Sequence, residues 1–229
     1  MKEVIGSYHM FLPRTWLKWC IYILYPVFVV GSLHVLYHYM QYFPMVCVCL
    51  GSGMIVAAEM MLDTYVFLGI GARDTNRLEY LKTSAKGMSL LKKALIMDGA
   101  RRFFSTLLIL LGVYFVMHLD GGIKDAFPLI KYVLCAEIVF ALMELGFIVT
   151  RRSTNVWINL IVTYILVGIA DVISITVVQC EVQAWMLVTA LAAGSGLAVV
   201  GRRQIGKRAE ESYYDERTES VIENDEIWE

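Results

Sequence analysis

The sequence predicts an all-α, polytopic integral membrane protein with six transmembrane helices and cytoplasmic N and C termini. Of its 229 residues, 58% are apolar and only 18% are charged, and the mean hydropathy is +0.61, which is too apolar for a soluble domain of this length. A spanning helix needs about 20 mostly apolar residues to cross about 30 Å of hydrocarbon. Six such runs lie between groups of charged residues, approximately Trp19 to Met40, Met45 to Ile70, Phe103 to Leu119, Leu129 to Val149, Val156 to Val178, and Val182 to Val200.

Basic residues define the expected orientation, because Lys and Arg near the ends of spans stay on the cytoplasmic side. Of the 20 Lys and Arg residues, all except Lys124 and Lys131 lie before the first span, in alternate loops, or after the last span. Both termini are therefore expected in the cytoplasm, and the protein in the cytoplasmic membrane of the cell. The first apolar run is too long for a cleaved signal peptide, so we interpret it as a retained span.

The chain divides into five expected segments. They are 1–18, an N-terminal interfacial (elbow) helix; 19–70, spans one and two; 71–102, a cytoplasmic amphipathic coupling loop; 103–201, spans three to six; and 202–229, an acidic cytoplasmic tail. The first segment mixes aromatic and basic residues around Pro13, which suits either a helix in the headgroup layer or the frayed start of span one. The tail is typical of a solvated end, although it keeps apolar residues with which to dock.

Enzyme chemistry is not indicated. The outer loops are short, with "QYFP", "DGGIKDAFP" and "QCE" as their sequences, and leave no room for an external domain. No G-x-x-x-x-G-K-[ST] motif is present for binding ATP phosphates. A serine protease needs a histidine base, and no histidine follows His118, so the two "GSG" stretches are interpreted as close helix packing. The net charge of −1 predicts no nucleic-acid partner, and we expect no metal site.

The stretch "EYLKTSAKGMSLLKKAL", Glu79 to Leu95, is the one amphipathic, lysine-rich segment. If 77–97 is helical, apolar side chains recur at steps of three and four and form one stripe, with lysines on the other face. The stripe comprises Leu78, Leu81, Ala85, Met88, Leu91 or Lys92, and Leu95. Gly87 weakens the middle of such a helix by about 1 kcal/mol relative to Ala, so two short helices fit as well as one. The segment either lies on the anionic inner leaflet or docks a cytoplasmic partner.

Acidic residues inside the spans are the second candidate feature, because a carboxylate in hydrocarbon is costly and marks a functional site by default. The candidate translocation path comprises Glu59, Asp63, Glu137, Glu144 and Asp171. From a rise of 1.5 Å per residue, Glu59 and Glu144 lie about 21 and 22 Å from the outer ends of their spans and are expected to meet in the inner half. No Lys or Arg is expected in the central part of any span, so the acids must be protonated, paired with neutral groups or histidine, or wetted.

The arrangement resembles the permease subunit of an ABC exporter of the second type. That family has an elbow helix, six spans, and a coupling helix between the second and third spans. The coupling segment has the pattern hydrophobic-Glu-x-Leu-x-[Ser/Thr]-[Ser/Leu]-Pro-x-[Ser/Gly], followed by an amphipathic run with Lys. This chain has "RLEYLKTSAKGMSLLKKAL" at that place, with Ala85 where proline is usual, and Pro26 in "ILYPVFVV" is similar to the family's early proline. The topological resemblance covers almost the whole chain, and the motif covers about 20 residues.

The resemblance implies a transport subunit energised by a separate ATP-binding cassette ATPase, which binds ATP and Mg²⁺, together with a second copy or a sister permease. It implies that the ATPase contacts the loop at Leu78, Leu81, Lys82, Lys86, Met88 and Leu91. The exported substrate would be peptide-like, lipid-like or drug-like. Two alternatives stay open: a proton-coupled secondary carrier that uses the intramembrane carboxylates, and a membrane scaffold or immunity protein that transports nothing. The halves of the chain show no internal repeat, which favours the permease over the carrier.

Overall fold

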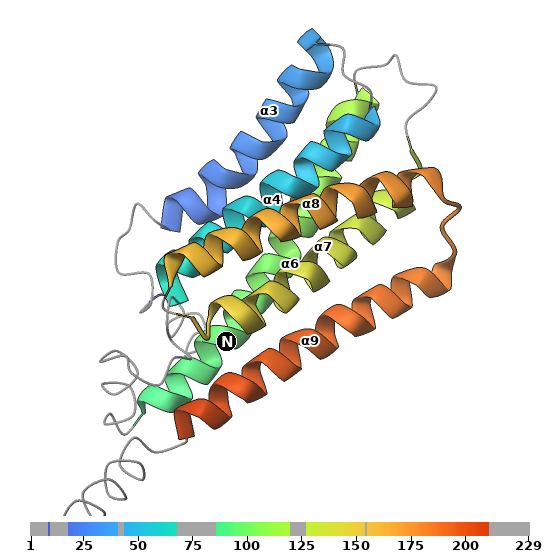
Figure 1. Cartoon of the computed structure of the whole chain (residues 1–229). Coiled ribbons are helices and arrows are strands. Elements are labelled where there is room, and N and C mark those ends of the chain that lie inside the picture. The colour runs from blue at the N-terminus through green and yellow to red at the C-terminus, as the bar shows by residue number, and fades with distance from the viewer. Residues whose placement is uncertain are drawn as a thin grey trace, which may run out of the picture.

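The computed structural model describes residues 9, 18–40, 44–67, 86–119, 127–153 and 155–210 (Figure 1). Every regular element in these ranges is a helix. The elements are η1 (Cys20–Leu24, a π-helical turn), α3 (Tyr25–Met40), α4 (Pro44–Phe67), α6 (Gly87–Leu119), α7 (Leu129–Thr150), α8 (Val156–Gln179) and α9 (Ala184–Glu210). Six of these helical stretches are long and apolar enough to cross a membrane, which confirms the predicted class of multi-pass membrane protein. The orientation of the termini stays a prediction.

Local sequence signals account for several helix ends. Pro44 begins α4. Proline is tolerated there because the backbone N–H at the start of a helix has no hydrogen-bond partner within the helix. Asn155 caps α8, because its side chain accepts a hydrogen bond of 2.9 Å from the backbone N–H of Trp157. Pro26 is the second residue of α3 and has no backbone N–H to donate to a carbonyl of the preceding turn. The π-helical turn η1 lies at that place.

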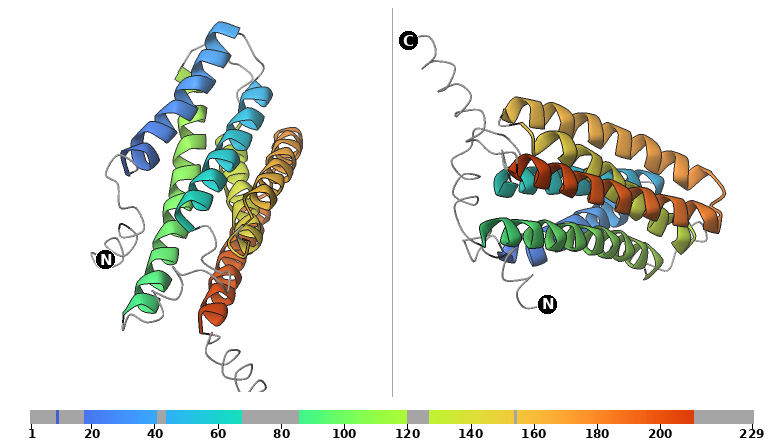
Figure 2. Two further views of the ribbon diagram at one scale, coloured as in Figure 1. Left: turned by 60° about the vertical axis from the view of Figure 1, so that its left-hand side comes forward. Right: turned by 90° about the horizontal axis from the view of Figure 1, so that it is seen from below.

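The helices α4 and α7 form the centre of the bundle. α7 contacts α4, α6, α8 and α9, whereas α3 contacts mainly α4 and α6, and α9 contacts α7 and α6. Within the most apolar windows of the spans, 61% of α7 and 56% of α4 are buried, against 17% for the first span and 11% for the last. Figures 1 and 2 show α3 and α9 on opposite sides of the bundle. The central pair is therefore where polar side chains are shielded from lipid.

Two apolar clusters hold the bundle together. The larger one runs along α3, α4, α6, α7 and α8 and contains fully buried side chains such as Ile55, Met60 and Met143. The smaller one lies where α4 ends and α6 begins, which we name the charged end of the bundle. It comprises Ile21, Val66, Phe67, Leu91, Ala94, Leu95 and Ile205.

Two helices extend past the expected segment boundaries. The loop was expected over 71–102, but α6 begins at Gly87 and continues without interruption to Leu119, so 87–102 belongs to the helix of span three. Gly87 is thus the first residue of a helix and not its weak middle. The tail was expected from residue 202, but α9 extends to Glu210. Hydropathy placed both boundaries at charged residues, whereas the helices continue through them.

The remaining parts of the expected segments lie outside the described residues. These parts are 68–85 of the amphipathic loop, most of the elbow segment 1–18, and 211–229 of the tail.

Candidate functional site

A cluster of ion pairs lies between α4, α6 and α7 at the charged end of the bundle. Its members are buried, with exposed fractions from 0% for Glu59 to 8% for Arg101. We name it the arginine–carboxylate cluster, and it comprises Glu59, Asp63, Asp98, Arg101, Arg102, Glu144 and Arg151. Asp63 lies four residues before the end of α4, which corresponds to about 6 Å along the helix.

Arg101 of α6 binds Glu59 of α4 in a two-point ion pair. Its Nη1 donates to Oε1 at 3.0 Å and its Nη2 donates to Oε2 at 2.6 Å. The same Nη2 contacts Asp98 Oδ1 at 3.3 Å, one turn earlier on α6. Paired N–H···O bonds between a guanidinium and a carboxylate are among the strongest side-chain contacts and fix the relative orientation of both groups. Glu59 therefore ties α4 to α6 with defined geometry.

Arg102 connects three helices. Its Nη1 lies 3.2 Å from Asp63 Oδ1 on α4 and 2.7 Å from Asp98 Oδ2 on α6. Its Nη2 donates to Glu144 Oε1 on α7 at 2.9 Å. With an exposed fraction of 1%, Arg102 is the largest fully buried side chain in the described residues.

Arg151 closes the cluster from the C-terminal end of α7. Its Nε donates to Asp63 Oδ1 and Oδ2 at 3.0 and 3.1 Å, its Nη2 contacts Asp63 Oδ1, and the same Nη2 lies 2.9 Å from Asp98 Oδ2. Burial alone would lower the pKa of Arg151, but the nearby charges of Asp63 and Asp98 and the hydrogen bond to Asp63 outweigh burial and raise the pKa above its usual value. Arg151 therefore stays charged.

Aromatic rings seal the arginines from one side. The Arg102 guanidinium carbon lies 4.0 Å from the centroid of the Phe147 ring, and that of Arg151 lies 4.9 Å from the centroids of both Phe67 and Phe147. Cations over ring faces gain electrostatic attraction, and the gain is larger when water is excluded. The smaller apolar cluster, to which Phe67 belongs, covers the same end of the bundle. The ion pairs are thus enclosed by protein.

An enclosed network of this kind holds helices in register and has little capacity to carry protons. Each carboxylate contacts at least one arginine, and removing the arginine leaves a buried polar group without its partner. The cluster can therefore couple helix movements. At the charged end of the bundle, α4, α6 and α7 either move together or exchange ion pairs when they separate.

The expectation that no Lys or Arg occupies the central part of a span is wrong for span three. Arg101 and Arg102 are interior residues of α6, within a candidate span that runs from Ser89 to His118. Glu59, Asp63 and Glu144 are therefore paired with arginine, and neither protonation nor a histidine partner is required. Glu59 and Glu144, which were expected to meet, lie in one cluster but bind different, adjacent arginines, Arg101 and Arg102.

A signal for this pairing is present in the sequence. Leu91, Leu95 and Asp98 follow one another at helical steps of three and four, and the same steps lead on to Arg101 and Arg102, so the helix of span three has no natural start at Phe103. Asp98 and Arg102 are spaced four apart, as an ion pair on one helix face would be. If every charged residue is read as the end of a span, neither the continuation of the helix nor the pairing of Asp98 with Arg102 is predicted.

Glu137 and Asp171 lie outside the arginine–carboxylate cluster. In the described residues, Glu137 Oε2 and Asp171 Oδ1 are buried and have no hydrogen-bond partner. Asp171 of α8 lies against Gly53 of α4, where an added Cβ would come within 2.7 Å of Oδ1. One turn further along α8, the Ser174 hydroxyl hydrogen-bonds to that of Ser52 on α4 at 2.8 Å. The five predicted acids thus separate into three that are ion-paired and two that are not.

The residues expected to contact an ATPase are only partly described. Leu78, Leu81 and Lys82 lie outside the described residues, and Met88 lies in the first turn of α6. Lys86 is exposed directly before that helix. Leu91 is 1% exposed and packs in the smaller apolar cluster, so in this structure it contacts the chain's own core and is not presented to a partner.

These observations define the class of the molecule as a multi-pass helical membrane protein with an enclosed ion-pair network at one end. No family model, curated protein or solved structure matches the chain. Function is therefore argued from the geometry.

Proposed function

We propose that this chain is the membrane subunit of an ATP-driven exporter, energised by a separate ATP-binding cassette ATPase at its charged end. The observation that supports the proposal best is the continuity of α6. This single helix of 33 residues begins within the lysine-rich segment, passes through the arginine–carboxylate cluster and ends at the opposite end of the bundle. At 1.5 Å per residue it is about 50 Å long, well beyond the thickness of the hydrocarbon.

A helix of this kind transmits force. A partner that binds near Gly87 acts on one end of a rigid rod whose interior is tied by Arg101 to α4 and by Arg102 to α4 and α7. Closure of the partner around ATP and Mg²⁺ would tilt α6, and the central helices would follow as packed elements that move between two arrangements. The two cationic side chains at its start, Lys92 and Lys93, support an acidic or phosphate-bearing partner surface.

A second copy of the chain, or a sister permease, belongs to the same proposal. The face of α8 that points away from the bundle carries large exposed apolar side chains, with Trp157 74% and Tyr164 77% exposed. In a membrane such a face is covered either by lipid or by another subunit. The substrate class stays as proposed from the sequence: peptide-like, lipid-like or drug-like.

Purification of the tagged full-length chain from its native membrane in mild detergent tests the proposal. We expect an ATPase with nucleotide-binding motifs to co-purify, detected by mass spectrometry, and the sample to hydrolyse ATP in the presence of Mg²⁺. Lys92→Glu, Leu81→Asp and Met88→Asp should each remove the ATPase. Arg203→Glu reverses an equally exposed cation on α9 and should leave the ATPase bound. A homogeneous chain with no ATPase and no ATP hydrolysis would contradict the proposal.

One observation favours a second candidate, a proton-coupled carrier. Glu137 and Asp171 keep buried carboxylate oxygens without a hydrogen-bond partner in the described residues, as expected of groups that take up protons. If the chain is a carrier, Asp171→Asn should abolish its activity and ATP depletion should not. If the chain is an ABC permease, the opposite pattern is expected. A scaffold without transport would tolerate Glu137→Gln and Asp171→Asn together.

A further inference from the structure

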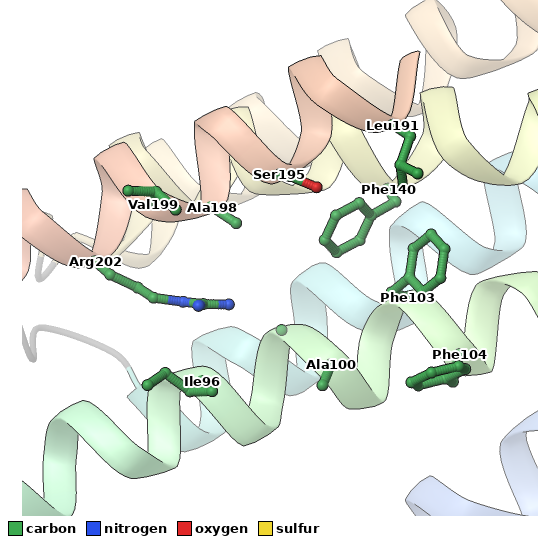
Figure 3. A pocket seen from close by; sticks show the side chains of 11 residues that line it. Ile96, Ala100, Phe103, Phe104, Phe140, Leu191, Ser195, Ala198, Val199 and Arg202 are labelled. Carbon is green, nitrogen blue, oxygen red and sulfur yellow. The ribbon is translucent and has the colours of Figure 1, made fainter. Parts of the chain in front are cut away.

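A cleft opens between α6 and α9, with α7 as its floor. Its volume is about 380 Å³. The walls are mainly apolar and aromatic, and the polar side chains that line it are Ser195 and Arg202, both on α9 (Figure 3). The lining residues are Ile96, Gly99, Ala100, Phe103, Phe104, Phe140, Leu191, Ser195, Ala198, Val199 and Arg202.

Arg202 brings into this cleft a cation that has no ion pair within the described residues. Figure 3 shows its side chain extending from α9 across the cleft toward α6. Gly99 leaves room for it, because an added Cβ there would lie 2.5 Å from Arg202 Nη2. Glu144 is the carboxylate nearest to this point, and its Oε1 already accepts from Arg102. In the described part of the chain, no carboxylate lies within ion-pair distance of Arg202.

We propose that the α6–α9 cleft binds an anionic phospholipid, with the headgroup phosphate at Arg202 and an acyl chain along the aromatic wall. Basic pockets between transmembrane helices recognise anionic headgroups in this way. A guanidinium presents several N–H donors in a planar fork that matches a phosphate, so an unpaired arginine is well suited to it.

The depth of Arg202 fits the position of a headgroup. The last span ends at Ile205, three residues beyond Arg202, which places the start of this side chain about 5 Å inside the end of the span. Figure 3 shows the side chain extending from there into the cleft, on the side of Ala198. A headgroup phosphate that binds Arg202 would therefore enter the cleft at the charged end of the bundle.

The apolar part of the cleft fits an acyl chain and opens toward lipid. From Arg202 to Leu191 along α9 the rise is about 16 Å, which accommodates much of a lipid tail. Phe104 is 60% exposed and Leu191 is 42% exposed, so the walls are in contact with whatever surrounds the bundle. In a membrane-spanning bundle, lipid surrounds these walls. The inference holds whether or not the chain is a transporter.

Native mass spectrometry of the full-length chain, delipidated in detergent and titrated with phosphatidylglycerol or phosphatidylcholine, tests the inference. We expect retention of phosphatidylglycerol in preference to phosphatidylcholine. Arg202→Gln should lower the occupancy of phosphatidylglycerol about fivefold or more, the effect of one basic residue at a lipid headgroup. Arg203→Gln is the matched control, since its side chain is exposed on the next position of the same helix and does not line the cleft.

A second variant tests the apolar half of the cleft without changing charge. Leu191→Trp fills the space beside Phe103 and Phe140 and should also lower the occupancy, even if Arg202→Gln proves poorly folded.

Equal occupancy in Arg202→Gln and the unmodified chain, equal losses in Arg202→Gln and Arg203→Gln, or full retention in Leu191→Trp would each overturn the proposal. The second outcome would indicate general attraction to a basic surface. Titration with inorganic phosphate separates headgroup recognition from lipid binding, because a lipid site should not be saturated by phosphate alone.

Discussion

Arg102 joins three helices within the arginine–carboxylate cluster. It contacts carboxylates from α4, α6 and α7 while stacked against Phe147, and it is almost fully enclosed. Its removal would leave Glu144 without an ion pair in the described residues and would weaken the charge balance at Asp63 and Asp98.

We predict that Arg102→Leu lowers the free energy of unfolding by about 3 to 5 kcal/mol, the penalty expected when one partner of a buried pair is removed. The matched control is Arg152→Leu, because Arg152 is exposed and contacts Gln204 and no carboxylate in the described residues. The control should change stability by less than about 0.5 kcal/mol. Thermal unfolding of both variants in the same detergent measures the difference, and equal stabilities would show that the cluster is not closed in solution.

The residue scale is also where prediction from sequence was least complete. Hydropathy identified Glu59, Asp63 and Glu144 as costly residues inside spans, and all three are members of the arginine–carboxylate cluster. Their partners could not be assigned, because Arg101 and Arg102 follow 42 and 39 residues after the acids they bind, and helix periodicity carries no information about which helices are neighbours. Arg202 and its cleft were not predicted for the same reason.

At the scale of elements, the pair between Glu59 and Arg101 is the clearest tie between α4 and α6. Asp98, the other contact of Arg101, is also held by Arg102 and Arg151. Replacing both members of the pair by leucine therefore leaves Asp98 compensated.

We predict that Glu59→Leu and Arg101→Leu each destabilise the protein and that the double variant is more stable than the sum of the two effects by about 1 to 3 kcal/mol. Chemical denaturation of the four proteins gives this coupling energy. Glu59→Leu combined with Arg152→Leu should be additive, because these residues do not touch. A coupling energy near zero for the first pair would mean that α4 and α6 are joined by apolar packing alone.

The helices themselves were largely predictable. Runs of about 20 apolar residues predicted all six candidate spans, since a helix of that length crosses the bilayer with its backbone groups paired within the segment. Gly87 and Phe103 show why boundaries were harder: charge was taken as the end of a helix, although ion pairing within the bundle allows a helix to continue through charged residues.

At the scale of the whole molecule, six candidate spans predict that both termini lie on one side of the membrane, and the distribution of basic residues predicts that this side is the cytoplasm. The chain carries a natural probe of this prediction. Cys47, Cys49 and Cys135 are buried, whereas Cys180 is exposed between α8 and α9, away from the charged end.

A membrane-impermeant maleimide should therefore label intact cells that express the unmodified chain, and Cys180→Ser should abolish this labelling. An added cysteine in Arg203→Cys, on the Cys180→Ser background, should react only after the cells are permeabilised. Labelling of Arg203→Cys in intact cells, with no reaction at Cys180, would reverse the orientation and place the arginine–carboxylate cluster at the outer face.

The 42-residue separation between Glu59 and Arg101 has a consequence for biogenesis. As the chain is synthesised, α4 emerges first, carrying two carboxylates whose guanidinium partners have not yet been made. On its own this helix is a poor candidate for release into hydrocarbon. We therefore expect the insertion machinery to retain α4 until α6 arrives, so that the two enter the bilayer together as a neutralised hairpin.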